Sequence, residues 1–182
     1  MKIRKATRKD YKKIAEIYRL CFTKKDYNEV WTQSMTLKKI NFLSRYCDIF
    51  VTLIDKKIIG FVAVNPSKWY VGRFADIEEI GIGPKYQNRG YGKQLLKFIE
   101  DYYKKKDYSY LIFTVNKTSK AYRKYKKMGY SEDKNGALFM KDLKRKAKLV
   151  SFITNKKSNE IKFYQKQGYK MKKERIVMEK LI

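Results

Sequence analysis

The stretch PKYQNRGYGKQLL, from Pro84 to Leu96, decides the fold because it places two glycines directly ahead of an apolar helical pattern. Gly90 and Gly92 follow a polar run, and the pattern continues on one helix face with Leu95, Leu96, Ile99 and Tyr103. Glycine lowers the stability of a helix start. We therefore expect either a tight turn here or the close approach of a ligand to the backbone.

A glycine-rich turn between a strand and a helix is typical of a phosphate-binding site. The first helical N–H groups have no partner within the helix, and the helix dipole is positive at that end. The loop GxxxxGK[ST] is excluded because Gln94 follows Lys93 and Gln87 stands at the earlier glycine position. The dinucleotide pattern GxGxxG is excluded because Leu95 occupies its third glycine position. The pattern that remains is QxxGxG.

Length and composition limit the class of protein. The chain has 182 residues, of which 43% are hydrophobic, as expected for one compact domain with room for an appendage. No apolar run approaches the roughly 20 residues of a membrane span, and the charged N-terminus has no apolar segment behind it. Two cysteines fit a reducing compartment. These features predict a soluble, cytoplasmic protein.

The absence of histidine excludes several kinds of catalytic site. Ser-His-Asp and Cys-His sites, HExxH zinc sites and two-His-one-carboxylate iron sites all need imidazole, and the chain has none. We therefore expect no metal. A general base has to be Asp, Glu, Tyr, Lys or a water molecule that they hold.

The net charge of +27 favours polyanionic partners such as nucleic acid, anionic lipid or a phosphate-rich cofactor. Lysine greatly outnumbers arginine, however, and an AT-rich genome produces the same bias without selection for binding. Charge alone therefore leaves nucleic acid as one open alternative.

The order of the expected elements predicts an α/β sheet. Strands are expected at 2–7, 49–54, 58–64, 74–82, 110–115 and 137–140, and helices at 8–21, 37–46 and 118–128, with a further helix that carries the apolar residues from Leu95 to Tyr103. Alternation of strands and helices over 74–140 predicts at least one parallel pair of strands.

An internal repeat follows. SKAYRKYKKMGY (119–130) and SNEIKFYQKQGY (158–169) align without gaps at an offset of 39 residues, and each lies between two strand patterns. Residues 144–182 therefore repeat a strand-helix-strand unit. This tail carries 13 Lys and Arg against 3 Asp and Glu, so it is denser in positive charge than the rest of the chain.

Four segments together resemble the GNAT superfamily of acyl-CoA N-acyltransferases. They are, in chain order, IRKATRKDYKKIAEIY (3–18), FADIEEIGIGP (74–84), the QxxGxG loop and SKAYRKYKKMGY. The resemblance covers residues 1–143 and implies the GNAT fold, a mixed central sheet flanked by helices. The tail of 144–182 would then extend the sheet or be exchanged in a homodimer.

The resemblance also implies acetyl-CoA as the bound cofactor. Its pyrophosphate would lie on the loop backbone, with extra charge from two side chains, Arg89 and Lys93; the loop residues are Gln87, Asn88, Arg89, Gly90, Tyr91, Gly92 and Lys93. Ile80, Gly81 and Ile82 would pair with the pantetheine arm through their backbone, and Asn116 would contact the same arm.

The implied reaction is direct transfer of an acetyl group to a primary amine, which needs a base. Strand alternation places Asp76 and Glu78 on one face and Glu79 on the other, unless a bulge changes it. We favour Glu78 as the base, directly or through water, and Asp76 as the second choice. A backbone N–H near Ile80 would polarise the carbonyl.

The acid that protonates the leaving thiolate is assigned by the resemblance to Tyr125, four residues before Gly129. Tyr164 holds the same place in the second copy of the repeat. Chain order favours Tyr125, because a short connection from the glycine-loop helix usually joins spatial neighbours.

The acceptor amine is left open by the sequence. Aromatic residues in 21–31 and 69–73 would enclose it, namely Tyr27, Trp31, Trp69 and Tyr70, although the same residues suit a core or an interface. A protein N-terminus, a lysine side chain and a small-molecule amine all remain candidates. The alternative function is a weakly catalytic or non-catalytic GNAT-like domain that binds nucleic acid or a ribosome through its basic tail.

Overall fold

The computed structural model describes residues 1–23, 30–66, 74–133, 136–142, 149–155, 160–166, 170–171 and 175–181. The chain divides into two compact units, residues 1–111 with 181–182, and residues 112–180. The domain boundary expected between residues 143 and 144 stays a prediction.

The first unit is built on a mixed sheet with strand order β1-β2-β3-β4-β5. Its elements are β1 (Lys2–Lys5), η1 (Arg8–Asp10), α1 (Tyr11–Phe22), α2 (Gln33–Leu43), β2 (Asp48–Ile54), β3 (Lys57–Asn65), β4 (Phe74–Ile82), η2 (Pro84–Tyr86), α3 (Tyr91–Lys104) and the start of β5 (Tyr110–Asn116). Strands β1 to β4 pair antiparallel in succession. Phe74 and Tyr110, which begin β4 and β5, stack with ring centroids 5.1 Å apart, as expected when two strands joined by a helix run parallel.

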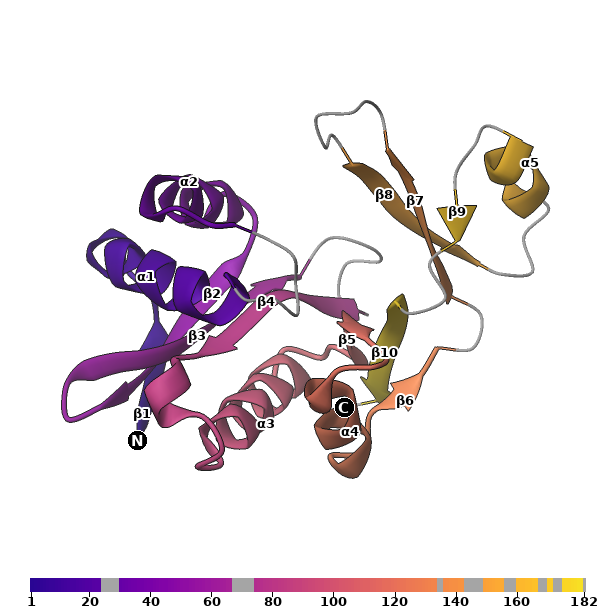
Figure 1. Ribbon diagram of the computed structural model, residues 1–182. Coiled ribbons are helices and arrows are strands. Elements are labelled where there is room, and N and C mark those ends of the chain that lie inside the picture. Colours follow the sequence, from indigo (N-terminus) through magenta and orange to yellow (C-terminus); the bar gives the residue numbers. More distant parts are fainter. Residues whose placement is uncertain are drawn as a thin grey trace. The chain divides into compact units, whose positions relative to one another are not determined.

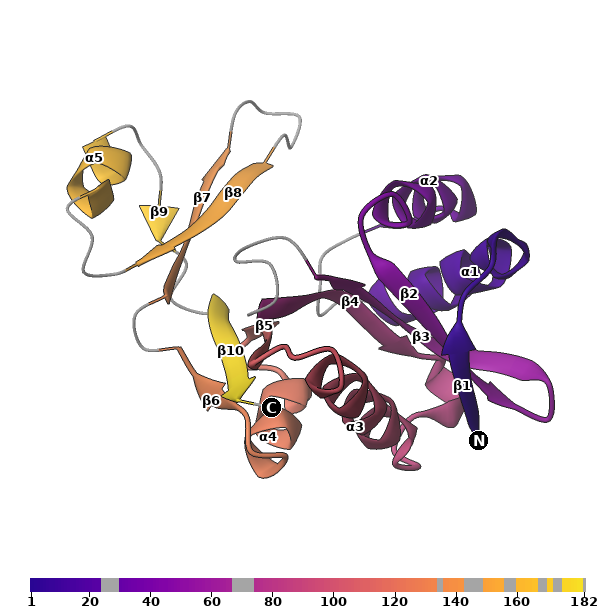
Figure 2. The same cartoon turned by 180° about the vertical axis from the view of Figure 1, so that it is seen from behind.

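Helices cover both faces of this sheet. Figure 1 shows α1 and α2 on one face and α3 on the other, and Figure 2 shows β1 at the edge of the sheet. The core on the α1 and α2 side is fully buried at Ile14, Ala15, Ile40, Val51, Phe61 and Ala63. On the opposite face Phe50 packs edge-on against Phe98 and Tyr102 of α3. The spacing of apolar residues correctly predicted the amphipathic helices α1 and α3.

Helix α2 begins earlier than the apolar pattern indicated. It runs from Gln33 to Leu43, whereas residues 37–46 were expected. Thr32 explains the difference, because its side-chain oxygen accepts a hydrogen bond from the Met35 N–H at 3.2 Å and caps the helix.

The second unit contains the rest of β5, α4 (Lys120–Lys127), β6 (Ser131–Glu132), β7 (Gly136–Asp142), β8 (Leu149–Asn155), α5 (Glu160–Lys166), β9 (Lys170–Met171) and β10 (Arg175–Leu181). Strand β10 lies between β5 and β6, while β7 lies between β8 and β9 in a separate sheet. The elements from β8 onward follow the order of those from β5 to β7. An extension of the family's sheet by the tail, or its exchange in a dimer, stays a prediction.

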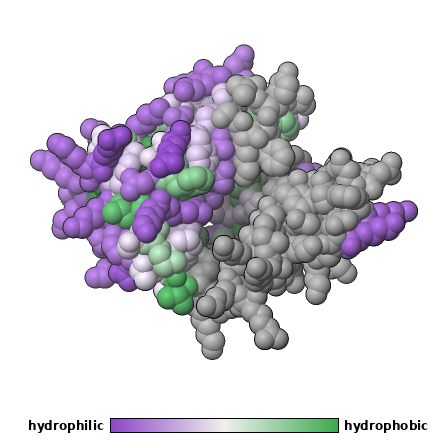
Figure 3. Space-filling view, turned by 90° about the horizontal axis from the view of Figure 1, so that it is seen from above, coloured by the Kyte–Doolittle hydropathy of each residue, from purple (hydrophilic) through white to green (hydrophobic). Residues whose placement is uncertain are grey.

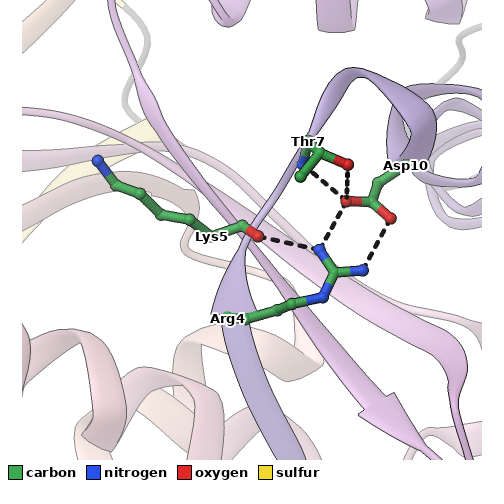
Figure 4. A network of polar contacts seen from close by, with 4 residues as sticks. All are labelled: Arg4, Lys5, Thr7 and Asp10. Carbon is green, nitrogen blue, oxygen red and sulfur yellow. Dashed lines mark hydrogen bonds and ion pairs between the residues drawn. The ribbon is translucent and has the colours of Figure 1, made fainter.

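A polar network joins β1 to the start of α1 (Figure 4). The Arg4 guanidinium donates to both carboxylate oxygens of Asp10, at 2.7 and 2.9 Å. The Thr7 N–H and hydroxyl donate to the same carboxylate at 2.7 and 3.0 Å. These donors, Arg4 first among them, outweigh the effect of burial and lower the pKa of Asp10 to about 2.

An Asp10→Asn substitution tests this network. Because hydrogen bonds to a charged group are worth about 1.5–3 kcal/mol and Arg4 is partly exposed, we expect a loss of about 1–2 kcal/mol at pH 7. The Asp10 pKa is lower in the folded chain than the value near 3.9 of the unfolded one, so its contribution is complete above about pH 5 and falls as the pH drops toward 2. Urea denaturation at pH 7, 4 and 3 should show that the difference in free energy of unfolding between variant and parent becomes smaller as the pH falls.

The exposed Lys97–Asp101 pair provides the control for this measurement. Asp101→Asn should change the free energy of unfolding much less than Asp10→Asn, because that pair lies in solvent. Equal effects of the two substitutions would contradict the role of the Asp10 network.

Candidate functional site

The turn from β4 to α3 is anchored to the sheet by two hydrogen bonds. The Gly83 N–H donates to the Ile59 carbonyl of β3 at 2.8 Å, and the Gln87 side-chain amide donates to the Ile82 carbonyl at 2.8 Å. The Gln87 N–H, predicted among the phosphate donors, donates to the Pro84 carbonyl at 3.3 Å. Gln87 therefore acts within the fold mainly as the side chain that fastens the loop to the end of β4.

The first turn of α3 presents its backbone N–H groups ahead of the helical ladder. Gly90 caps the helix with φ = 81°, and Gln94 donates the first ladder bond to the Gly90 carbonyl at 3.1 Å. By helix geometry the N–H groups of residues 91–93 precede that ladder. They lie at the positive end of a 14-residue helix, an arrangement suited to an anion.

The two glycines of the loop have different reasons to be glycine. Gly90 has a positive φ, which an L side chain adopts only with strain. Gly92 has no positive φ, and outside its own helix backbone and chain neighbours a Cβ placed there would come no closer to a protein atom than 3.8 Å, the distance to Ile82 Cγ1. The fold therefore requires glycine at position 90 but leaves room for a side chain at position 92.

Positive side chains surround this helix start. Arg89 and Lys93 are exposed, as is Lys85 in the preceding η2 turn. Because these side chains remain in water, they attract an anion without the cost of burying a charge.

The end of β4, predicted to meet the pantetheine arm, is also one of the most closely packed parts of the unit. Ile80, Gly81 and Ile82 lie opposite residues 62, 61 and 60 of β3. A Cβ on Gly81 would approach Phe61 Cε1 to 2.9 Å and Cys21 Sγ to 3.3 Å, so packing against α1 requires glycine here. The pairing of this segment with the arm stays a prediction.

A bulge in β4 changes the predicted positions of the three carboxylates. Ala63 lies opposite Glu79, but the next residue, Val64, lies opposite Ile77, so Glu78 is the extra residue of the bulge. Glu78 accepts a hydrogen bond from Asn65 at 3.4 Å, and Asp76 lies opposite Asn65 and is buried. The predicted alternation does not hold at Glu78 and Glu79, because a bulge advances the chain by one residue without a partner.

Glu79 is held by side chains of both helices on one face of the sheet. Its Oε1 lies 2.8 Å from Lys39 Nζ of α2 and 3.1 Å from the donating Tyr18 hydroxyl of α1. Burial raises the pKa of Glu79, and Lys39 and Tyr18 oppose that shift because they favour the charged form. Glu79 is therefore a structural anion between the sheet and both helices.

Glu78 and Glu79 also affect the pKa of Tyr46, a residue that the sequence did not single out. Burial, followed by the charges of Glu78, Cys47 and Glu79, raises the pKa of Tyr46 to about 12. Tyr46 follows the last turn of α2, so the charges of Glu78 and Glu79 are both felt at that end of the helix. Only a weak sequence signal pointed to Lys39 as a partner of Glu79: Lys39 is a basic residue next to Ile40 on the buried stripe of α2.

The residues predicted to complete the site from downstream lie in the second unit. Asn116 Oδ1 accepts hydrogen bonds from the Thr118 N–H and hydroxyl at 2.9 and 2.8 Å, which closes the turn between β5 and α4. Tyr125 lies on α4 with its ring 4.6 Å from that of Phe113. Tyr164 belongs to α5. The predicted roles of these three residues stay predictions.

The predicted acceptor pocket is described only in part. Tyr27, Trp69 and Tyr70 lie outside the described residues. Trp31 packs edge-on against Tyr18 at 5.1 Å, beside the core.

Within the described ranges, no three His, Cys, Asp or Glu side chains are placed to hold a metal ion. None of the helices in those ranges has the length and apolar composition that a membrane span needs.

The sequence profile of the acetyltransferase (GNAT) family matches residues 11–130, which include the carboxylates, the glycine loop and Tyr125. The chain belongs to the GNAT acetyltransferase family. The predicted α/β GNAT fold is thereby confirmed, and the family supports an N-acetyltransferase at the general level. Among curated protein sequences, no significant match is found.

Solved structures of GNAT proteins share the fold. The ribosomal-protein-S18-alanine N-acetyltransferase from Escherichia coli superposes with a TM-score of 0.63 at 16% identity, covering 100% of this chain and 93% of that one. The PaiA N-acetyltransferase from Thermoplasma acidophilum, in complex with coenzyme A, gives 0.64 at 17% identity, covering 100% and 98%. A GNAT acetyltransferase from Elizabethkingia anophelis with acetyl-CoA bound gives 0.63 at 16%, covering 100% and 97%. At such identities the likeness shows the fold alone.

Replacing Lys39 tests the Glu79 ion pair. Lys39→Met leaves a largely buried carboxylate without its cation, and since Lys39 is one-third exposed we expect a loss of about 1–3 kcal/mol at pH 7. The pKa of Glu79 should rise further above its unfolded value near 4.3, so the variant should lose stability as the pH rises from about 4 to 7. Urea denaturation across this range measures both effects.

Two further variants make the result specific. Lys38→Met, on the exposed neighbouring residue of α2, should leave the pH profile of the parent unchanged. Lys39→Met combined with Glu79→Gln should remove the added pH dependence, since no buried carboxylate remains at that site. Persistence of the dependence in the double variant would refute the assignment to Glu79.

Proposed function

We propose that this GNAT protein is an acetyl-CoA-dependent N-acetyltransferase that passes an acetyl group directly to a primary amine. The observation that carries the proposal is the start of α3, where backbone N–H groups precede the helical ladder and Gly92 is a glycine that the fold itself does not need. A bare backbone at that position suits the close approach of a diphosphate. The coenzyme A and acetyl-CoA complexes of two structural neighbours support the same cofactor.

The residues at this helix start fit the cofactor's pyrophosphate. Backbone N–H groups of residues 91–93 would hold it, and the exposed Arg89 and Lys93 would add charge. The αL conformations of Asn88 (φ = 62°) and Gly90 shape the loop before the helix begins. We assign the pantetheine arm to the backbone of residues 80–82 and to Asn116, as the family resemblance implies.

The chain's own residues would move the protons of the reaction, while acetyl-CoA supplies the acetyl group as a thioester. Glu78 would take a proton from the ammonium group of the acceptor, directly or through water, which leaves a neutral amine to attack the thioester carbonyl. We prefer Glu78 to Glu79 because the Glu79 carboxylate is already engaged by Lys39 and Tyr18, and taking up a proton there would weaken that ion pair. Asp76 is the second choice. The N–H near Ile80 would polarise the carbonyl, and Tyr125, or Tyr164 in its place, would protonate the thiolate.

An acceptor screen tests the proposal as a whole. The full chain is mixed with acetyl-CoA and one of three acceptor classes, peptide N-termini, lysine peptides or small amines, and the released thiol is followed with a chromogenic disulfide. Acetyl-CoA should also raise the melting temperature, because a ligand that binds only the folded state stabilises it. If acetyl-CoA neither binds nor turns over, the enzyme assignment fails and the non-catalytic alternative is favoured.

A Gly92→Ala substitution separates binding from folding. The fold has room for the added methyl group, and alanine favours a helix by up to about 1 kcal/mol over glycine, so stability should stay level or rise. The dissociation constant for acetyl-CoA should nevertheless rise at least about tenfold, because the methyl group keeps the diphosphate from the backbone. Calorimetric titration with acetyl-CoA and urea denaturation measure the two quantities.

Gly90→Ala provides the contrast. It forces a side chain into the left-handed region and should cost roughly 1–2 kcal/mol of folding stability. Unchanged acetyl-CoA affinity in Gly92→Ala would show that the diphosphate does not lie against the backbone at the start of α3.

Replacing Glu78 tests the base. Glu78→Gln should lower kcat about 100-fold or more near neutral pH, with little change in stability, because a positioned base contributes 10²–10⁴-fold. The deficit should shrink as the pH approaches the pKa of the acceptor amine, since more of the amine is then neutral without help. The pH profile of kcat/KM, measured on the best acceptor of the screen, provides the comparison.

Two other carboxylates are compared in that profile, Glu16 as a control and Asp76 as the second candidate base. Glu16→Gln, on the exposed face of α1, should leave the rate unchanged, and Asp76→Asn should reduce it less than Glu78→Gln. A larger loss with Asp76→Asn would transfer the role of base to Asp76.

A further inference from the structure

A basic cleft of about 540 Å³ lies between α1 and α2, apart from the α3 loop. Three cationic residues line it: Arg8 from η1, Lys12 from the first turn of α1, and Arg45 just after α2. All three are exposed. None of the residues predicted for acetyl transfer lines this cleft.

The cations of the cleft have no counter-ion within the described part of the chain. No carboxylate lines the cleft, and none of the three cations forms an ion pair with a described residue. The nearest carboxylates along the chain are engaged elsewhere, Asp10 with Arg4, Glu16 with Lys13 and Asp48 with Lys5. Helix α2 itself contains no acidic residue. Like charges gathered around one hollow repel each other, and a bound anion would relieve that repulsion.

The remaining lining residues suit a planar ring next to an anionic group. Tyr11 and Leu37, both half-buried, provide an aromatic and an aliphatic surface. Asn41 contributes an exposed amide, and Ser44 a hydroxyl that donates to the Asn41 carbonyl at 2.9 Å. Aromatic rings stack on nucleobases, amides bond to base edges, and guanidinium groups bind phosphates in a fork geometry.

The surroundings of the cleft favour a strand over a compact ligand. Figure 3 views the molecule from the side of α1 and α2, and the described surface there is largely hydrophilic. The cations lie at the rim, exposed to solvent, where successive phosphates of a strand can reach them. The net charge of +27 steers a polyanion toward the protein in general.

We propose that the α1–α2 cleft binds single-stranded nucleic acid, with one base on Tyr11 and the flanking phosphates on Arg8, Lys12 and Arg45. The site is independent of acetyl transfer. It differs from binding through the basic tail, because its residues all belong to the first unit.

The test uses the full chain and a fluorescein-labelled single-stranded RNA octamer in fluorescence anisotropy titrations at several salt concentrations. Arg8→Gln combined with Arg45→Gln should weaken binding at least about tenfold at low salt. Because this variant removes two phosphate-binding cations, the slope of log K against log salt should become less steep by about 1.4, since each neutralised phosphate of a single strand contributes about 0.7.

The matched control removes the same charge elsewhere. Lys104→Gln combined with Lys105→Gln, exposed at the end of α3, should weaken binding less than about threefold. A third variant, Tyr11→Leu, keeps an apolar side chain but removes the aromatic face, and should weaken binding about fivefold or more without changing the salt slope. Circular dichroism confirms that each variant is folded.

Each other outcome overturns the proposal. Equal weakening by the cleft and control variants would assign binding to overall charge. Equal competition by a glutamate octapeptide would indicate an acidic protein partner instead. A mononucleotide that competes as well as the octamer, mole for mole, would indicate a small-molecule site, and no binding at low salt would exclude nucleic acid at this cleft.

Discussion

The Ile82 carbonyl oxygen joins three parts of the first unit. It accepts the Gln87 amide at 2.8 Å and lies 3.3 Å from the donating Cys21 thiol, while its strand pairs with β3. The end of β4, the last turns of α1 and the start of the glycine loop are therefore held at one atom. The position of the α3 N-terminus depends on that attachment, because the loop is anchored to the sheet ahead of the helix.

The β4 bulge has a comparable effect on the carboxylates. A regular strand would send Glu78 and Glu79 to opposite faces, whereas the extra residue breaks that alternation, and the charges of both carboxylates raise the pKa of Tyr46 after α2. Glu79 is then paired with Lys39 and accepts a hydrogen bond from Tyr18, which ties it to both helices, and we prefer Glu78 as the candidate base. One irregularity in the strand thus separates a structural carboxylate from a catalytic candidate.

Much of the fold could be predicted from local spacing. The helices α1 and α3 and the β2–β3 hairpin follow from apolar periodicity, and the glycine loop from elimination of other phosphate motifs. The start of α2 was missed because a single capping threonine, not the apolar pattern, determines it. The partners of Glu79 were missed because Tyr18 and Lys39 are far from it in the chain and are brought near only by helix packing. In the second unit two similar strand patterns compete for the place beside β5, and β10 rather than β7 occupies it.

The sequence by itself determined the family, the order of the elements and the residue types available for chemistry. Four ordered segments, the QxxGxG loop among them, indicate the family, and apolar periodicity indicates the elements. Composition, which includes no histidine, limits the chemistry. All of these depend only on neighbours in the chain or on residue counts. Tertiary structure alone decided which glycine the fold requires, which carboxylate is neutralised and where cations gather between α1 and α2. These properties depend on distances between segments far apart in sequence, and packing, not local propensity, determines such distances.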